Sequence, residues 1–210
     1  MKVLLAGEGP TELGGWANEP AYRTPENPGL LEVLARRIRP DGWEIGDAII
    51  WKYIRKYRSG DHRTPEQRNL LGALLLAHEK GLSGVVFSRD RDGDVEREHQ
   101  FNQALARAAG QFPSLTLAGG MAVEEIEAWV LAMRGDKRAE RHRDPKQELG
   151  KHGVVGLEAM RQVAEKADLA QACAHSPSLA SWLERAKALG GAKTEPSAAA
   201  SPQPKPKKAP

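Results

Sequence analysis

The sequence predicts an α/β fold with a mostly parallel central sheet flanked by helices. Short apolar runs, each the length of a buried strand, alternate along the chain with longer segments whose apolar residues recur at helical spacing. The order is strand then helix, four times over, and such an alternation favours parallel strands in one sheet. More helical segments follow the last predicted strand, so we also expect C-terminal helices.

The first predicted strand covers residues 2–6, an apolar run that stops at Gly7-Glu8-Gly9. Residues 9–28 are rich in Gly, Pro, Asn and Thr and predict a loop. A loop of that length inside a compact domain is usually functional or mobile. Apolar residues over 30–38 then share one helix face, and Pro40 ends that helix.

The middle and the end of the chain continue the alternation. Residues 43–54 are rich in β-branched and aromatic residues and predict one strand, or two strands with a turn near Gly46. Thr64 followed by Pro65 is typical of a helix start, because Thr caps the first turn and Pro needs no backbone donor there. The remaining predicted elements are a strand over 84–88, a helix up to Gly110, a strand over 115–117, a helix from Val123, and helices over about 157–174 and 178–189.

The composition is that of a soluble globular protein. The 210 residues include 31 Lys and Arg against 28 Asp and Glu, a formal net charge of +3. The longest apolar run, Leu70 to Ala77, is too short to cross a bilayer, and the first residues do not resemble a secretory signal. The single Cys173 excludes an internal disulfide framework and a cysteine-rich zinc site. We therefore expect a cytoplasmic protein that does not contact a membrane.

The excess positive charge lies at the C-terminal end. Residues 190–210 carry four Lys and one Glu, whereas the other 189 residues carry 27 bases and 27 acids. Because this segment is rich in Pro, Ala and Ser and lacks apolar periodicity, it predicts a disordered basic tail. A short basic tail is more typical of a solvated end than of a nucleic-acid contact.

Carboxylates follow three of the predicted strands. They are Glu8 after the first strand, Asp90, Asp92 and Asp94 after the strand over 84–88, and Glu124, Glu125 and Glu127 after the strand over 115–117. Parallel strands end at one edge of a sheet, where ligands bind in such folds, so these side chains are expected to gather there. Crowded carboxylates repel one another unless a cation neutralises them, and Mg²⁺ prefers such hard oxygen ligands. The pattern therefore predicts a site for one or two Mg²⁺ (or Mn²⁺) ions that acts in phosphoryl transfer.

Simpler interpretations of these acids stay open. The helix dipole alone favours acids such as those over 124–127 at a helix start, and the run over 90–94 is also typical of a polar turn. Glu8 between two glycines is compatible with an ordinary loop residue. Other kinds of site fail on spacing: Val95 stands where a calcium loop needs Gly, no phosphate-loop Gly-Lys-Ser/Thr follows Gly9, and the six His show no metal-ligand pairing.

Two of the strand ends resemble the motifs of the Toprim domain, which is shared by topoisomerases, primases, overcoming-lysogenisation-defect nucleases and small ribonucleases. The first strand runs into Glu-Gly at residues 3–9, and a later strand runs into Asp-x-Asp at residues 85–92. The EGPTE stretch at 8–12, with EEIEAW at 124–129 and DPK at 144–146, is similar to a small Toprim-like bacterial family. Members of that family are often found beside ATPase genes in phage-defence loci.

The resemblance covers about residues 1–150 and implies a Rossmann-like Toprim catalytic domain there. A helical extension over 151–189 would follow it. The resemblance also implies that Glu8 binds metal or acts as a general acid or base, and that Asp90 and Asp92 bind metal.

Further acids and one base complete the expected site. Glu127 is our choice for an additional metal-binding and catalytic carboxylate, with Glu124 as its rival, and at i, i+3 the two would share one helix face. Asp94 extends the expected set of metal ligands. Lys146 would stabilise the negative charge of a phosphate, although a solvated Lys at a helix start is the simpler interpretation.

The segment over 51–58 interleaves four bases with three aromatic residues. In a strand, one face would carry Trp51, Tyr53, Arg55 and Tyr57. Aromatic platforms beside bases suit single-stranded nucleic acid, but Lys and Arg also protect an exposed sheet edge, and we favour that interpretation. His62 and Arg63 follow in a loop and are candidates to approach the metal site.

These inferences predict a Mg²⁺-dependent nuclease that cleaves DNA or RNA, and the resemblance implies that it is the effector of a bacterial anti-phage defence system. The alternative is a non-catalytic or conditionally active subunit that docks, and is gated by, an ATPase. Exposed apolar residues in the last helices, such as Trp182 and Leu183, would favour that alternative. A weaker third interpretation makes Asp90 the nucleophile of an Asp-x-Asp phosphohydrolase. Self-association is left open.

Overall fold

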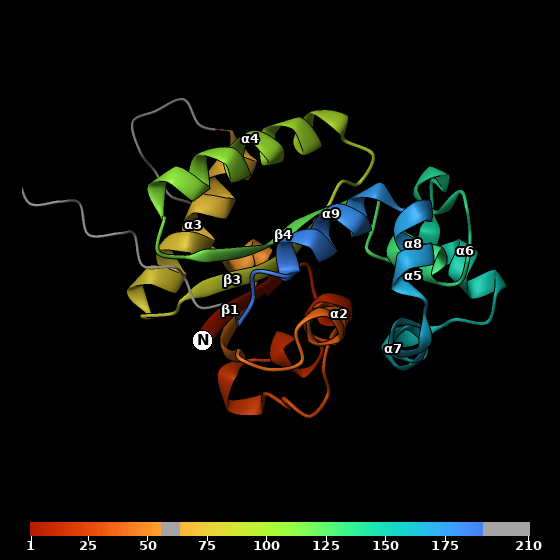
Figure 1. Ribbon diagram of the computed structural model, residues 1–210, viewed down its shortest axis with the longest axis horizontal. Coiled ribbons are helices and arrows are strands. Elements are labelled where there is room, and N and C mark those ends of the chain that lie inside the picture. Colours follow the sequence, from red (N-terminus) through yellow and green to blue (C-terminus); the bar gives the residue numbers. More distant parts are fainter. Residues whose placement is uncertain (56–63, 191–210) are drawn as a thin grey trace, which may run out of the picture.

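Parallel strands form the centre of the molecule. The computed structural model describes residues 1–55 and 64–190, and within them a four-stranded sheet has the order β2-β1-β3-β4. The strands are β1 (Lys2–Gly7), β2 (Glu44–Ile50), β3 (Gly84–Asp90) and β4 (Thr116–Ala122). Each neighbouring pair is parallel, so the predicted α/β fold with a parallel central sheet is confirmed (Figure 1).

Helices cover both faces of this sheet. In β1, Val3 and Leu5 pack into one hydrophobic cluster, whereas Leu4 and Ala6 pack into the other, as strand alternation requires. The helices on the two faces are α3 (Pro65–Glu79) with α4 (Val95–Gln111), and α2 (Leu30–Ile38) with α9 (Pro177–Ala186) (Figure 1). Because both of its faces are buried, the inner strand β1 is apolar after Lys2, whereas the edge strand β2 is only partly buried and carries Glu44 and Asp47.

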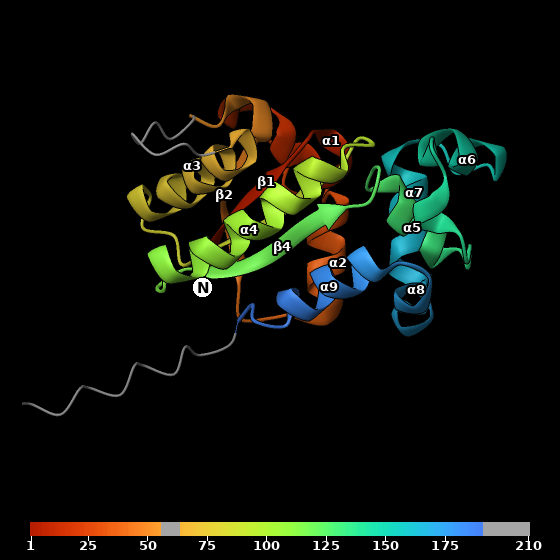
Figure 2. The same cartoon turned by 90° about the horizontal axis from the view of Figure 1, so that it is seen from above.

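A group of short helices lies beyond the carboxyl ends of the strands (Figure 2). Its members are α5 (Glu127–Met133), the 3₁₀ turn η4 (Ala139–Arg141), α6 (Pro145–Lys151), α7 (Gly156–Lys166) and α8 (Leu169–His175). The chain then returns along β4 as α9. There the buried indole of Trp182 donates to the Phe87 carbonyl at 2.7 Å and lies 5.7 Å from the ring of Trp129 in α5. The last helices therefore share one core with the sheet.

The helix starts follow local signals in the sequence. At the start of α3, Thr64 accepts a backbone N–H of the first turn and Pro65 is the first helical residue, as predicted. Asp94 and Asp144 cap α4 and α6 in the same way. Each cap satisfies a backbone donor that the helix leaves without an internal partner.

The segment over 43–54 departs from the predicted strand. The strand ends at Ile50, and Trp51–Tyr53 form a 3₁₀ turn, η3. The ring of Trp51 turns into the core, where it meets Phe87 and Phe101 at centroid distances of 6.1 and 6.4 Å, whereas Tyr53 is exposed. The prediction that Trp51 and Tyr53 share one strand face is therefore wrong, because burial of the indole ends the strand. The next residues, 56–63 with Tyr57, His62 and Arg63, lie outside the described residues.

Three other segments differ from the predicted elements. The predicted loop over 9–28 contains α1 (Pro10–Leu13) and two 3₁₀ turns, η1 (Gly15–Ala17) and η2 (Pro20–Tyr22). The helix predicted from Val123 begins at Glu127, because Glu124 has a left-handed backbone with φ of 62°. The helix predicted over 157–174 is two helices, and Asp168 caps the second one.

Within residues 1–55 and 64–190, no helix has both the length and the apolar character that crossing a bilayer requires. The predicted tail lies outside the described residues from residue 191 onward. The single Cys173 is a free thiol in α8.

Candidate active site

The first carboxylates of the candidate site come from the turn between β1 and α1. Glu8 follows the strand directly, and Gly9 precedes the helix in an extended conformation. Glu12 closes the first turn of α1, because its Oε2 accepts the Gly9 N–H at 3.0 Å. A β-carbon on Gly7 would lie 2.6 Å from the Cβ of Glu12, so glycine at this position lets α1 rest directly on the strand end. The result is a glutamate that is only 3% exposed.

The next carboxylates come from two loops that are joined by hydrogen bonds. After β3, the Arg91 N–H donates to the Ala122 carbonyl and the Asp92 N–H donates to the Glu124 carbonyl, both at 3.0 Å. Asp90 Oδ1 accepts the Ile126 N–H at 3.1 Å. These bonds hold the end of β3 beside the start of α5, which places Asp90 near the acids of that helix.

Six ionisable side chains line one cavity of about 220 Å³. They are Glu8 and Glu12 from the β1–α1 turn, Asp90 from the end of β3, Glu125 and Glu127 from the start of α5, and Lys146 from α6. The cavity lies at the carboxyl edge of the sheet and holds five acids and one base. This is the edge at which parallel sheets bind ligands.

Burial changes the acidity of this cluster. Burial, followed by the negative charges of Glu12 and Glu127, raises the pKa of Asp90 to about 8. Burial likewise raises the pKa of Glu12 to about 7. Backbone N–H groups lower this pKa and the negative charge of Glu127 raises it, but burial has the largest effect. Each acid is harder to ionise because it is out of water and beside other acids. Full ionisation of the cluster at neutral pH therefore needs additional positive charge nearby.

Lys146 supplies part of that charge. Its ammonium group lowers the pKa of Glu125 and of Glu127, but burial and the neighbouring acids outweigh it, and both pKa values are raised. Glu125 Oε2 is buried and accepts no hydrogen bond from the described residues. One lysine is thus shared among several carboxylates, which leaves the cavity short of positive charge.

An ion-pair network holds Glu8 at the rim of the cavity. Arg89 is largely buried and binds Glu8 on one side and Glu66, at 3.2 Å, on the other. Arg97 pairs with Asp92 and approaches Glu66 at 3.6 Å. Burial lowers the pKa of Arg89, as does the charge of Arg97, while Asp92 and Asp90 oppose the shift. Glu8 is therefore positioned by Arg89, which is itself fixed from both sides.

Three of the predicted metal ligands do not line the cavity. Asp92 is exposed and pairs with an arginine, Asp94 caps α4, and Glu124 pairs with Arg91. Glu124 precedes the helix with a left-handed backbone, so the helix face predicted for Glu124 and Glu127 does not exist. The predicted residues that the structure does bring together are Glu8, Asp90, Glu127 and Lys146.

The donor chemistry of the cavity fits a hard divalent cation. Glu12, Asp90 and Glu127 supply carboxylate oxygens, and their raised pKa values indicate a deficit of positive charge. In the part of the chain that the structure describes, no three His, Cys, Asp or Glu side chains are gathered closely enough to form a ready metal site. The fit is thus one of chemistry and charge, and binding of an ion would have to draw the carboxylates together.

The sequence does not single out Glu12, and it places Glu125 at this edge of the sheet without indicating that Glu125 lines the cavity. Glu12 belongs to the EGPTE stretch that carries the family resemblance, but nothing in that stretch indicates its burial, which comes from the packing of α1 on β1. Glu125 belongs to a run of acids, and the left-handed backbone at Glu124 determines which of these acids face the cavity. A left-handed glutamate is uncommon and has no signature in the sequence.

No family model matches this chain, and no match was found among curated proteins or among solved structures. The likeness to the Toprim domain therefore stays a hypothesis that rests on the two strand-end motifs. Function has to be argued from the carboxylate cavity and its surroundings.

Proposed function

We propose that this protein is a Mg²⁺-dependent nuclease of the Toprim type that hydrolyses phosphodiester bonds of DNA or RNA. The observation that carries the proposal is the cavity at the carboxyl edge of the sheet, in which Glu12, Asp90 and Glu127 lie beside Lys146. Burial and the neighbouring acids raise the pKa of each of these carboxyl groups, and a cation in the cavity would favour their ionised forms.

The residues that would hold Mg²⁺ or Mn²⁺ are Glu12, Asp90 and Glu127, with Glu8 at the rim. A bound ion would supply Lewis acidity toward a phosphate and toward water. Lys146 would pair with the negative charge of the phosphate, as a fixed cation beside a reacting group does. Arg89 would keep Glu8 oriented toward the cavity, because it binds this carboxylate directly.

The biological setting of the proposal comes from the family resemblance alone. In that setting the nuclease acts in anti-phage defence together with an ATPase partner. Exposed Trp182 and Leu183 would have favoured a subunit that only docks a partner. Both side chains are instead buried in the core that the last helices share with the sheet. An activity that depends on the partner remains an outcome of the test below.

The test measures cleavage of plasmid DNA, single-stranded DNA and total tRNA with Mg²⁺, with Mn²⁺ and with EDTA. Asp90→Asn removes one carboxylate of the cavity, and Asp94→Asn is its matched control. Asn caps a helix as well as Asp does, so the control removes a charge from the same loop without disturbing α4. We expect cleavage that needs metal and that falls at least about 100-fold in Asp90→Asn, with little change in Asp94→Asn.

The outcomes separate the competing functions. Equal loss of activity in both variants would contradict a specific role for the cavity. Metal binding by the wild type without cleavage of any substrate would favour the partner-gated subunit. Trapping of a phosphoryl-aspartate mimic, formed with beryllium fluoride, would instead support Asp90 as a nucleophile.

A further inference from the structure

We propose that exposed bases between α5 and α6 form a track on which the phosphate backbone of a nucleic acid reaches the carboxylate cavity. This basic strip consists of Lys137, Arg138, Arg141, Arg143 and Lys146. The inference rests on the proposed function, because it names the surface that binds the same substrate outside the cavity.

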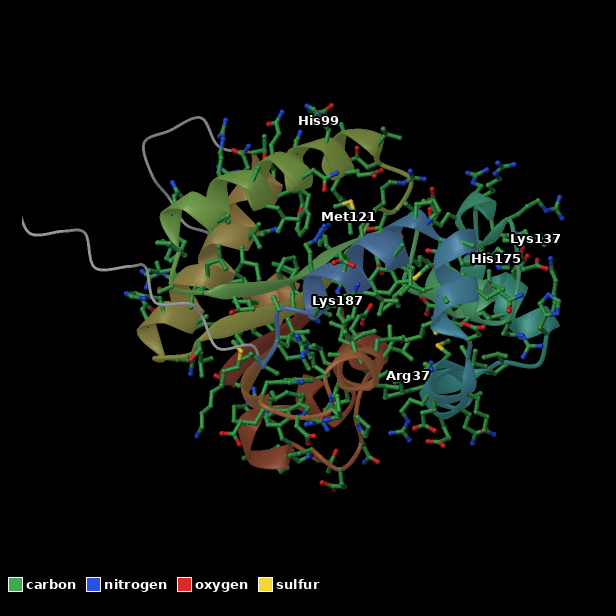
Figure 3. All side chains as sticks on the ribbon, viewed as in Figure 1. Arg37, His99, Met121, Lys137, His175 and Lys187 are labelled. Atoms are coloured by element: carbon green, nitrogen blue, oxygen red, sulfur yellow. The ribbon has the colours of Figure 1, made fainter. Side chains whose placement is uncertain are left out.

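The strip concentrates positive charge in a body whose bases and acids are equal in number overall. Residues 137–146 hold five bases and two acids, whereas residues 1–189 hold equal numbers of bases and acids. All five bases are exposed. Figure 3 shows Lys137 on the outer side of the helical group, pointing away from the sheet. A local excess of exposed Lys and Arg is the surface that nucleic-acid phosphates bind.

Of the two acids in this segment, Glu140 faces the fold, whereas Asp144 is exposed beside the strip and lines the same groove. Glu140 Oε1 accepts hydrogen bonds from Ser176 Oγ and from Ser178 N and Oγ, at 2.5 to 2.9 Å, which ties η4 to the start of α9. Asp144 caps α6 through a backbone N–H at 2.7 Å. By contrast, the side chains of the first four bases of the strip make no hydrogen bond or ion pair with any described residue. Their charges are therefore available to a partner.

A groove connects the strip to the carboxylate cavity. It has a volume of about 690 Å³, and two bases of the strip, Arg143 and Lys146, line it. Its other charged lining residues are Lys151 and Glu148, which pair at 2.7 Å, and the acids Glu125 and Asp144. Glu125 and Lys146 line both the groove and the cavity, so the two spaces are adjacent. Arg143 and Lys146 could therefore contact the phosphates of one bound strand.

The chemistry of the groove favours a phosphate backbone as its ligand. Its lining residues include no Phe, Tyr or Trp, so the groove offers no surface on which a base could stack. Lys and Arg contacts to phosphate are independent of sequence and weaken steeply with salt. The strip therefore predicts binding without sequence preference.

The experiment measures binding separately from cleavage. Fluorescence anisotropy of a labelled single-stranded oligonucleotide, recorded in EDTA at several salt concentrations, compares the wild type with Arg141→Glu/Arg143→Glu. The matched control is Arg107→Glu/Lys166→Glu, which changes net charge equally at exposed positions on α4 and α7. We expect the strip variant to bind at least about tenfold more weakly, with a shallower salt dependence, and the control to bind like the wild type.

The outcomes distinguish failure of the strip from failure of the nuclease. Binding that depends on the strip, without cleavage in Mg²⁺, would support the strip and contradict the nuclease. Cleavage together with equal binding by the strip variant and the wild type would support the nuclease and overturn the strip. If the wild type binds no nucleic acid, the strip proposal is overturned, and an acidic protein becomes the ligand to seek.

Discussion

Glu12 is the most deeply buried carboxylate of the cavity, and its charge is costly there. Because burial raises its pKa to about 7, the ionised form is destabilised at alkaline pH. Gln keeps the shape and the acceptor for the Gly9 N–H but removes that charge. We expect Glu12→Gln to raise the free energy of unfolding by roughly 1–3 kcal/mol at about pH 8 in EDTA, measured by urea titration.

The control for this substitution is Glu19→Gln, at an exposed glutamate outside the cavity. We expect it to leave the free energy of unfolding within about 0.5 kcal/mol of the wild type. Added Mg²⁺ should stabilise the wild type more than Glu12→Gln, because the variant has lost one candidate ligand. A variant that is less stable than the wild type in EDTA would show that Glu12 serves the fold mainly as a helix cap.

At the level of single residues, the sequence could locate the acids but not select among them. Glu8, Asp90 and Glu127 could be predicted because each follows a predicted strand at the ligand-binding edge. Glu12 could not be predicted, because its role in the site follows from its burial, which comes from the packing of α1 on β1. Glu124 does not share a helix face with Glu127, since its left-handed backbone precedes the helix and its carboxylate pairs with Arg91.

At the level of elements, the close packing of α1 on β1 requires a residue without a side chain at position 7, which is Gly7. Alanine there would bring its Cβ to 2.6 Å from the Cβ of Glu12, so α1 would have to move off the strand end. We expect Gly7→Ala to lower the free energy of unfolding by about 1–3 kcal/mol and to reduce stabilisation by Mg²⁺. Both effects can be measured by thermal unfolding with and without the ion.

Gly110→Ala is the matched control for this prediction. A Cβ at Gly110, in the last turn of α4, would meet nothing within 4 Å. Its expected effect is a gain of up to about 1 kcal/mol, because Ala restricts the unfolded chain. Equal behaviour of the two variants would contradict the close packing of α1 on β1.

The position of α9 gives a second prediction at this level. Trp182 is fully buried, donates to the Phe87 carbonyl and packs against Trp129. Trp182→Ala should therefore cost about 3–5 kcal/mol in the free energy of unfolding, whereas Tyr22→Ala, at an exposed ring, should cost less than about 0.5 kcal/mol. A small effect of Trp182→Ala would instead favour the view that α9 is a docking surface for a partner.

Element types could be predicted from the sequence more reliably than their ends. The helix over 30–38 and the cap at Thr64 follow from local patterns, and both are found. The end of β2 could not be predicted, because Trp51 is as apolar as a strand residue and its partners are distant in the sequence: the rings of Phe87 and Phe101 and the Ser88 carbonyl, which accepts its indole N–H. Local propensity is overridden in such cases by tertiary packing.

At the level of the whole molecule, the strand–helix alternation predicts a parallel sheet but leaves the order of its strands open. The order β2-β1-β3-β4 depends on which strands find partners in three dimensions. The alternation nevertheless predicts that the acids of three segments, those after β1, β3 and β4, lie at one edge. Parallel strands all point the same way, so residues at their carboxyl ends share one edge, and these acids meet because β1, β3 and β4 are consecutive in the sheet.

The same cluster of acids determines how the stability of the whole molecule should change with pH. The pKa of Asp90 is raised to about 8 from its ordinary value of 3.8, and that of Glu12 to about 7 from 4.5. Between the ordinary and the raised pKa values, the folded protein holds protons that the unfolded chain has released. The free energy of unfolding therefore falls as the pH rises through this range. The lowered pKa values of Asp47 and Asp136 act oppositely, but only below about pH 4.

We therefore expect the free energy of unfolding in EDTA to be highest at about pH 5. It should fall by about 3 kcal/mol or more as the pH is raised to about 8.5. Mg²⁺ binds carboxylates in their ionised form, so it should restore stability at the alkaline end and have little effect near about pH 5. Urea titrations across this range, with and without Mg²⁺, measure both effects. The double variant Glu12→Gln/Asp90→Asn should give a flatter profile that responds little to the ion. Stability that rises with pH in EDTA would mean that these carboxylates are ionised in the folded protein, and the argument for a cation in the cavity would lose its basis.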